Sequence, residues 1–380
     1  MFDFNLSEGL RLSVGNQEAT FLISSAGGYI SAFMNRVRKH LPYVYRYPGV
    51  MPRAVANYLQ MATGKRRLRG VEFALTYDCV AHCEHCSAEF LREKTPNREA
   101  LSLTQIKNVA SQCLDLGALN INLTGGEALL RQDLPEIVAA CRPRSTVVSL
   151  ASNGWLIDNS VAKNIASWGV SIVTMSMDSA DPKTHDERRR LPGCYDQLMK
   201  AVDYLQRAGV EVFLNTILTR ENMANGDMEE MVRLAKQKDV VLTVNLACEV
   251  GGWQTADVHP KSGGTDYHRS LMKHPHVRWE GSSNYFREGC PAGLEKIYIS
   301  PYGDVMPCNF IHLSFGNLQN LPLAMIWEKI LSDPTFNRIH KRCLVAENAE
   351  FRREYLTPIS KSPVHPMPVG EVPLDCKDRV

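Results

Sequence analysis

The sequence predicts an α/β fold, a partial (β/α)6 barrel of parallel strands followed by a small C-terminal domain. Between residues 71 and 250, six apolar runs rich in β-forming residues are separated by helical patterns. Strands that alternate with helices pair in parallel through right-handed crossovers. Polar or glycine-rich clusters follow four of these runs, and the carboxyl ends of strands are where the chemistry of parallel barrels collects.

Residues 1–70 are expected to form a helical, basic N-terminal extension. Helical patterns cover Leu22–Leu41 and Ala54–Thr63. A basic cluster follows, made of Lys65, Arg66, Arg67 and Arg69. One interpretation is an amphipathic element that contacts a membrane surface or an anionic partner. The other, which we favour, is a helical lid on the main domain whose charges are simply solvated.

Residues 71–250 form the expected barrel, and its elements follow from the hydrophobic periodicity. The expected strands are Phe73–Tyr77, Leu119–Leu123, Thr146–Leu150, Ser171–Met177, Val210–Ile217 and Val240–Leu246. The expected helices are Leu103–Leu116, Leu134–Cys141, Val161–Trp168, Tyr195–Ala208 and Met228–Lys236. The clusters after the first four strands are Cys79–Cys86, Thr124–Glu127, Ser152–Gly154 and Ser176–Ser179. Because these strand ends share one rim, the clusters should surround a single site.

Beyond residue 250 the alternation stops. We interpret residues 251–285 as a linker, residues 286–350 as a small cysteine-bearing domain and residues 351–380 as an extended, proline-rich tail. Helices are expected at Leu323–Leu331 and Phe336–Cys343.

A hairpin is expected inside the small domain. Lys296–Ser300 and Val305–Cys308 would be its strands, with Pro301–Asp304 as the turn. Cys290 and Cys308 flank it, an arrangement that holds metal ligands close together.

The composition narrows the class of protein. A net charge of +2 over 380 residues gives no general case for nucleic acid as a partner. Eleven cysteines, an odd number, and an N-terminus without the pattern of a secretory signal indicate reduced thiols in the cytoplasm. The apolar stretch Phe21–Met34 is too short to span a bilayer, which requires about 20 apolar residues.

Three cysteines in eight residues, Cys79, Cys83 and Cys86, can converge on one inorganic centre. Three thiolates are one ligand fewer than a closed zinc or iron–sulfur site normally uses, so one coordination position would remain open. A zinc site or inert thiols are the alternatives. The spacing Cys-x3-Cys-x2-Cys, with His85 before the last cysteine and Gly-Gly-Glu after the next strand, resembles the signature of the radical S-adenosylmethionine (SAM) enzymes.

This resemblance implies that the three thiolates hold a 4Fe-4S cluster whose fourth iron is chelated by SAM. An electron would enter through a reductant such as flavodoxin or ferredoxin, cleave the sulfonium, and give an adenosyl radical that abstracts hydrogen from substrate. The residues whose positions resemble the family's cofactor-binding positions are His85, Gly125, Gly126, Glu127, Asn153, Ser176 and Arg188.

The roles carried over differ among these residues. Gly125, Gly126 and Glu127 would receive the methionine amino group, Asn153 and Ser176 would contact ribose or carboxylate, and Arg188 would pair with the carboxylate. The alternatives stay open: an ordinary strand-to-helix turn for the glycines, helix capping for Asn153 and Ser176, and a solvated face for Arg188. Three consecutive arginines, residues 188–190, leave open which one points inward.

Cys290, Cys308 and Cys343 resemble a shortened, SPASM-like (twitch) extension that binds one auxiliary 4Fe-4S cluster. Cys376, another group or the substrate could complete that site. The remaining cysteines are expected to be ordinary core or surface thiols: Cys113, Cys141, Cys194 and Cys248. The histidines of the C-terminal part are expected to be ordinary hydrogen-bonding residues: His312, His340 and His365.

The resulting hypothesis is a radical SAM enzyme that acts on a small metabolite of sugar or nucleoside type, with oxidation or bond formation. A ribosomally made peptide and a lipid-linked substrate are alternatives. A non-catalytic iron–sulfur or zinc-binding protein is the alternative from another class.

Overall fold

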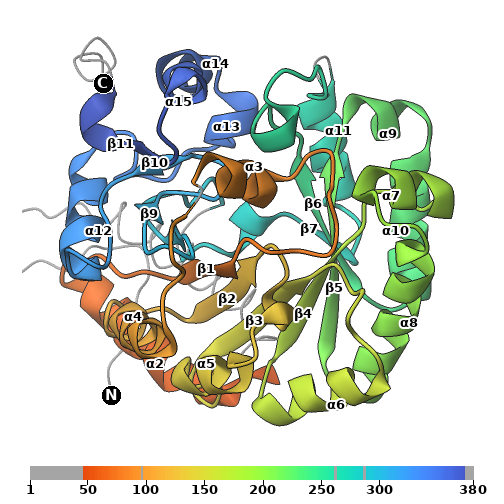
Figure 1. Cartoon of the computed structure of the whole chain (residues 1–380), viewed down its shortest axis with the longest axis horizontal. Coiled ribbons are helices and arrows are strands. Elements are labelled where there is room, and N and C mark those ends of the chain that lie inside the picture. The colour runs from red at the N-terminus through yellow and green to blue at the C-terminus, as the bar shows by residue number, and fades with distance from the viewer. Residues whose placement is uncertain (1–45, 96, 261–262, 286–287, 373–380) are drawn as a thin grey trace, which may run out of the picture. The chain divides into compact units, whose positions relative to one another are not determined.

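A sheet of nine strands organises the described part of the chain (Figure 1), in the order β7-β6-β5-β4-β3-β2-β1-β8-β9. The computed structural model describes residues 46–95, 97–260, 263–285 and 288–372. The chain divides after Pro48 into two units, and the sheet belongs to the unit that begins at Gly49. The expected helix Leu22–Leu41 lies outside the described residues, as does Cys376.

All six expected strands of the barrel are present and run in parallel in chain order. They are β1 (Gly70–Thr76), β2 (Asn120–Gly125), β3 (Val147–Ser152), β4 (Ile172–Ser176), β5 (Glu211–Leu218) and β6 (Val241–Leu246). The sheet is curved but open, since β7 and β9 are its two edges. This confirms the predicted partial parallel barrel.

Helices cover the outer face of this sheet (Figure 1). The expected ones are α4 (Leu103–Asp115), α5 (Leu134–Ala140), α6 (Asn159–Trp168), α8 (Cys194–Arg207) and α10 (Asp227–Gln237). Their starts are set locally, for example by the capping box of Ser102 and Gln105 before α4. Three short elements were not expected from the hydrophobic pattern because they are too polar: α3 (Ser87–Lys94), α7 (Pro182–Arg189) and α9 (Arg220–Ala224). A 3-10 turn, η2 (Ala128–Leu130), follows β2.

The two faces of the strands differ in polarity because side chains alternate along a strand. Val71 and Phe73 of β1 are buried in the apolar core under the helices. Glu72, between them, instead lines a cavity on the inner side of the sheet. The inner side therefore offers polar groups to a ligand, while the outer side provides the hydrophobic stabilisation.

Before the barrel stand η1 (Pro48–Val50) and α2 (Met51–Ala62). Asn57 of α2 is buried and donates hydrogen bonds to the Gly117 carbonyl and the Tyr285 hydroxyl, at 2.6 and 2.7 Å. Arg67 donates to Asn57 at 3.1 Å. Because Gly117 precedes β2, this helix packs at the amino ends of the strands, so it does not cover the rim at their carboxyl ends.

The predicted hairpin is confirmed: β8 (Lys296–Ile299) pairs in parallel with β1, and β9 (Val305–Met306) returns antiparallel to β8. Helix α12 (Leu323–Ser332) matches its prediction. The expected helix Phe336–Cys343 is not formed, because His340 bridges to Cys290 in an antiparallel pair instead.

The segment expected to be a linker has structure of its own. It contains η3 (Gly251–Trp253), α11 (Gly264–Leu271), β7 (Val277–Arg278) and η4 (Glu280–Ser283). Strand β7 extends the sheet, since Leu242 of β6 pairs with Val277.

The expectation of an extended tail was wrong as far as residue 372. The segment forms α13 (Leu344–Glu347), α14 (Ala349–Phe351), the π-helical η5 (Arg352–Leu356), α15 (Thr357–Lys361), β11 (Met367–Pro368) and η6 (Val369–Glu371). Strand β11 pairs with β10 (Leu313–Ser314). The ring centroids of Phe351 and Tyr355 lie 6.1 and 6.0 Å from that of Phe336. The burial of these aromatic rings therefore folds the segment despite its prolines. None of the helices in the described ranges is long and apolar enough to cross a membrane.

Candidate active site

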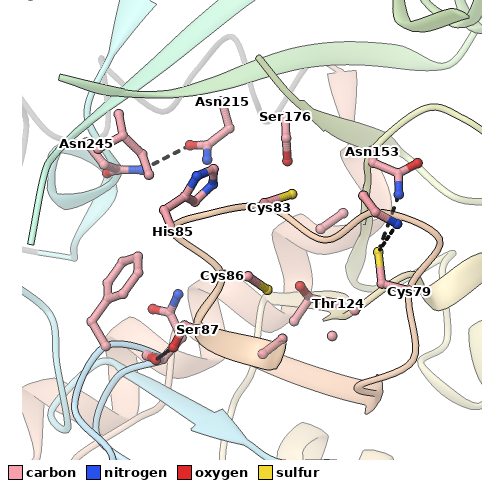
Figure 2. Close-up of a pocket in the computed structure, with 18 of the residues that line it drawn as sticks. Cys79, Cys83, His85, Cys86, Ser87, Thr124, Asn153, Ser176, Asn215 and Asn245 are labelled. Atoms are coloured by element: carbon pink, nitrogen blue, oxygen red, sulfur yellow. Dashed lines mark hydrogen bonds between the residues drawn. The ribbon is translucent and has the colours of Figure 1, made fainter. Parts of the chain in front are cut away.

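A cavity of about 240 Å³ opens at the carboxyl ends of the strands. Figure 2 shows the loop after β1, which carries three cysteines, beside the ends of the neighbouring strands. Of the residues that the sequence singled out, the cavity wall contains Cys79, Cys83, His85, Cys86, Gly125, Gly126, Asn153 and Ser176. The expectation that strand-end clusters surround one site is therefore met for these residues.

Each cysteine of the loop accepts a hydrogen bond from nitrogen. The Cys86 thiol caps α3 by accepting from the Glu89 amide at 3.2 Å. The Cys79 thiol accepts from the side-chain amide of Asn153 at 3.5 Å, and the Arg189 guanidinium donates to Cys83 at 3.6 Å. Burial raises the pKa of Cys83 to about 11, while Arg189 opposes that rise. A cationic centre would be needed to bring such buried thiols into the thiolate form.

The donor set fits a cluster better than an ion. Among the residues that the structure describes, no three thiol, imidazole or carboxylate groups converge closely enough to bind one metal ion. Three cysteines along one wall suit an iron–sulfur cluster, because the cluster spreads its thiolate ligands over several irons.

The glycines after β2 are required by packing against the end of β1. A Cβ at Gly125 would lie 2.0 Å from the Thr76 carbonyl oxygen, and one at Gly126 would lie 2.2 Å from that of Asp78. The Gly126 amide donates to the Thr76 carbonyl at 2.8 Å. The pair thus fits an ordinary tight turn, and this turn also holds the start of the cysteine loop against the cavity.

Glu127 does not line the cavity. Its buried carboxylate accepts hydrogen bonds from the Ser152 hydroxyl at 3.0 Å and from the backbone amides of Asn153 at 2.9 Å and Leu129 at 3.3 Å. Burial raises the pKa of Glu127 to about 7 despite these bonds. In this structure the carboxylate holds the turn after β3, and its contact with the methionine amino group stays a prediction.

Asn153 and Ser176 reach the cavity and cap no helix. Asn153 accepts from the Trp155 amide at 2.8 Å, and α6 is capped by Asp158. Helix α7, which follows Ser176, is capped by Asp181. The helix-capping alternative is therefore removed for both residues.

Of the three consecutive arginines, Arg189 lines the cavity and Arg188 does not. Arg188 pairs with Glu221 at 2.7 Å and donates to the Asp178 carbonyl at 2.9 Å. Arg189 makes its ion pair with Asp178 inside the cavity wall, with 2.6 Å between Nε and Oδ2. Arg188, the residue predicted from the sequence, is thus the neighbour of the arginine that faces the cavity. A helical pattern without an apolar side does not show which of the arginines points inward.

His85 is held by a residue that the sequence placed in a linker. Its ring lies 5.0 Å from that of Trp253, centroid to centroid, and its Nε2 is 3.9 Å from Asp178 Oδ1. A Cβ at Gly252 would lie 2.0 Å from the Glu84 carbonyl oxygen, so η3 packs directly on the cysteine loop. The sequence signal was available, since Gly-Gly-Trp follows the last barrel strand at the same rim.

Several cavity residues were missed altogether. Asn215 of β5 and Asn245 of β6 share a hydrogen bond of 2.9 Å (Figure 2). Glu72, Tyr298 and Asn309 line the cavity as well. Polar side chains inside apolar strands were the signal for Glu72, Asn215 and Asn245.

The second group of cysteines is brought together. The Cys343 thiol hydrogen-bonds to those of Cys290 and Cys248. Burial raises the pKa of Cys308 to about 12, and the nearby Cys290 adds to this rise. Cys248, which was expected to be an ordinary thiol, lies both in this group and in the cavity wall.

The other residues considered have simpler surroundings. Cys113 and Cys141 are fully buried in the apolar core. The Cys194 thiol donates to Asp186 at 3.3 Å. His312 Nε2 lies 2.7 Å from the Ser87 hydroxyl, His340 Nε2 lies 2.6 Å from the Thr335 carbonyl, and His365 packs edge-on against Phe90.

Comparison with known proteins agrees with this architecture. Residues 73–235 match the family described as the radical SAM superfamily, and residues 290–349 match an iron–sulfur cluster-binding domain, SPASM. The chain belongs to the radical SAM superfamily and carries a C-terminal SPASM region. It is therefore a radical SAM enzyme, with a 4Fe-4S cluster, SAM and an auxiliary iron–sulfur cluster as its cofactors.

Individual relatives are distant. The AdoMet-dependent heme synthase of Nitratidesulfovibrio vulgaris is 28% identical over 290 residues, which cover 68% of this chain and 78% of that protein. The PqqA peptide cyclase of Granulibacter bethesdensis is 23% identical over 277 residues, which cover 68% and 73%. The structure of Streptococcus suis SuiB bound to S-adenosylmethionine aligns with a TM-score of 0.56 at 18% identity, covering 83% of this chain and 78% of that one. Such a likeness establishes the shared fold.

Proposed function

We propose that this enzyme holds its 4Fe-4S cluster on Cys79, Cys83 and Cys86 and acts on a small metabolite of sugar or nucleoside type, with oxidation or bond formation. The observation that carries the proposal is that these thiols and the polar ends of neighbouring strands line one cavity. When bound, the cluster and SAM supply a radical that abstracts hydrogen from a C–H bond.

The residues beside the cysteine loop would hold SAM. Gly125 and Gly126 present backbone at the cavity wall, and Asn153 and Ser176 present an amide and a hydroxyl. Arg189 takes the place first assigned to Arg188, because its guanidinium is the one that reaches the cavity. Its charge is already paired with Asp178, so we assign it a positioning role next to Cys83.

The rest of the wall would bind the substrate. Asn215, Asn245 and Asn309 carry amides, which both donate and accept hydrogen bonds. Such groups suit a ligand rich in hydroxyl, ether or amide oxygens, as sugars and nucleosides are. A relative named for a small product, heme synthase, supports a small metabolite in general over a peptide or a lipid-linked substrate.

One observation supports each of the two alternative substrate classes. The relative named PqqA peptide cyclase favours a ribosomally made peptide. Met51, Val55 and Leu59 are exposed at successive turns of α2 and would favour a lipid-linked substrate at a membrane surface.

The cofactor assignment is tested by anaerobic reconstitution followed by reduction, chemically or with flavodoxin or ferredoxin. With SAM present, 5′-deoxyadenosine should form, and replacing Cys79, Cys83 and Cys86 by alanine should abolish it. Cys113→Ala, a buried thiol of α4 outside the cavity, is the matched control and should retain the activity. Product formation by the triple variant would contradict the assignment.

The substrate class is tested with separated metabolite, peptide and lipid fractions of a cell extract. We expect only the metabolite fraction to accelerate formation of 5′-deoxyadenosine. Acceleration by the peptide or lipid fraction alone would replace our proposal with the corresponding alternative.

A further inference from the structure

Four cysteines lie on segments that come together where the C-terminal region packs on the barrel. Cys248 follows β6, Cys290 and Cys308 flank the β8–β9 hairpin, and Cys343 precedes α13. The Cys343 thiol hydrogen-bonds to both Cys248 and Cys290. The group therefore joins segments that lie far apart in the sequence.

Backbone hydrogen bonds fix this meeting point. The Cys290 amide donates to the His340 carbonyl at 2.7 Å, which brings the segment before Cys343 alongside. The Gly293 amide donates to the Pro307 carbonyl at 3.1 Å, which places Cys308 next to the turn after Cys290.

Cys248 is anchored from the barrel side. The Ala247 amide donates to the Leu218 carbonyl at 3.0 Å, and the Cys248 thiol donates to the Leu246 carbonyl at 3.3 Å. Cys248 is 8% exposed, and it forms part of the cavity wall. Its side chain thus lies between the cavity and the thiol of Cys343.

A buried group of charged side chains lies beside Cys308 and holds the hairpin in place. Cys308 lies near the buried ammonium of Lys296, whose charge opposes the effect of burial on that thiol. Lys296 is itself paired with Glu72 at 2.9 Å and with Glu280. These ion pairs connect β8, the first strand of the hairpin before Cys308, with β1 and η4.

We propose that Cys248 is the fourth protein ligand of the auxiliary cluster, together with Cys290, Cys308 and Cys343. That the bound group is an iron–sulfur cluster follows from the family assignment. The choice of Cys248 follows from the contacts of the four cysteines in this structure. It replaces Cys376 as the candidate fourth ligand.

A closed set of four thiolates leaves no iron of the auxiliary cluster open to substrate. The cluster would then serve as an electron carrier at the cavity wall, because one of its ligands, Cys248, belongs to that wall. Direct ligation of substrate by this cluster, one of the possibilities open from the sequence, is thereby disfavoured.

The test uses the full chain with Cys79, Cys83 and Cys86 replaced by alanine, so that only the auxiliary cluster can assemble. After anaerobic reconstitution this variant should bind about four irons, against about eight in the unmodified protein. Adding Cys248→Ala should lower the iron content below about four and alter the electron paramagnetic resonance spectrum of the cluster. Adding Cys376→Ala or Cys141→Ala should change neither quantity.

Cys248→Ser gives a second measurement if the alanine variant folds poorly, as judged by circular dichroism. Serine offers an oxygen ligand, so the iron should largely remain while the spectrum and the reduction potential shift. Unchanged iron and an unchanged spectrum in both Cys248 variants, or no iron in the starting variant, would overturn the proposal. Failure of the Cys79, Cys83 and Cys86 assignment would appear separately, as equal iron in the unmodified protein and the starting variant.

Discussion

Arg189 and Asp178 form a two-point ion pair in the cavity wall, with 2.6 Å between Nε and Oδ2 and 3.0 Å between Nη2 and Oδ1. Burial alone would raise the pKa of Asp178, but Arg189 and the neighbouring histidines lower it to about 2. The same guanidinium donates to Cys83, so the pair connects the cysteine loop with the end of β4.

Arg189→Gln is expected to destabilise the cluster-free protein by about 3–5 kcal/mol, because it leaves the Asp178 carboxylate buried and unpaired. The double variant Arg189→Gln with Asp178→Asn should regain much of that loss. Lys183→Gln on the same helix is the control, since both members of its ion pair with Glu187 are largely exposed, and it should cost less than about 1 kcal/mol. Urea unfolding measures the three variants, and equal effects of Arg189→Gln and Lys183→Gln would contradict the prediction.

Glu127→Gln is expected to change how stability depends on pH. The folded-state pKa of Glu127 is about 7 against an ordinary value of 4.5, so the native state holds the proton more tightly than the unfolded state. The stability that Glu127 contributes is therefore fully present below pH 4.5 and is lost as the pH rises through 7. In the glutamine variant this loss, at most about 3 kcal/mol, should be absent.

Urea unfolding at pH 5 and pH 8 checks this prediction. The stability of the variant relative to the unmodified protein should increase between the two values. Glu328→Gln, at an exposed position of α12, should show no such increase. A difference that stays constant with pH would show that Glu127 is ionised in the native state throughout.

Gly126→Ala is expected to displace the turn after β2 from the start of the cysteine loop. Its Cβ would lie 2.2 Å from a backbone oxygen, which cannot move without shifting the loop, so we expect a cost of about 3 kcal/mol. Gly70→Ala is the control, because the added carbon would have no atom within 4 Å apart from Gly70 itself and its chain neighbours. Thermal unfolding and iron content measure the effect, and normal iron loading of Gly126→Ala would argue against the proposed coupling.

Asn153→Ala removes the amide that donates to the Cys79 thiol at 3.5 Å. Hydrogen bonds to ligand sulfur stabilise the reduced, more negative cluster, so the variant's reduction potential should shift to a more negative value. Ser176→Ala, at the end of the next strand, is the comparison because none of the described contacts joins it to a cysteine. Redox titration followed by electron paramagnetic resonance decides the outcome, and identical shifts in both variants would contradict the assigned contact.

The repeated elements of the barrel were predictable from local pattern. Each strand of residues 71–250 is a short apolar run, and each long helix has an apolar stripe, so periodicity alone locates them. The three cysteines after β1 were equally visible, because their spacing within one loop already brings them together.

The short polar helices and the C-terminal segment were not predictable in this way. Helix α7 presents charges on most of its surface, so nothing in its pattern distinguishes Arg188 from Arg189. The segment after residue 350 is ordered by packing on Phe336, a contact that no local pattern reports.

The sequence by itself determined the fold class and the first group of thiols, since both depend on residues close together in the chain. Only the tertiary structure decided which arginine faces the cavity, that Glu127 is buried beneath Asn153, and that Cys248 joins Cys343. These depend on the orientation of helices and on contacts between distant segments, which arise when the sheet and its C-terminal region pack together.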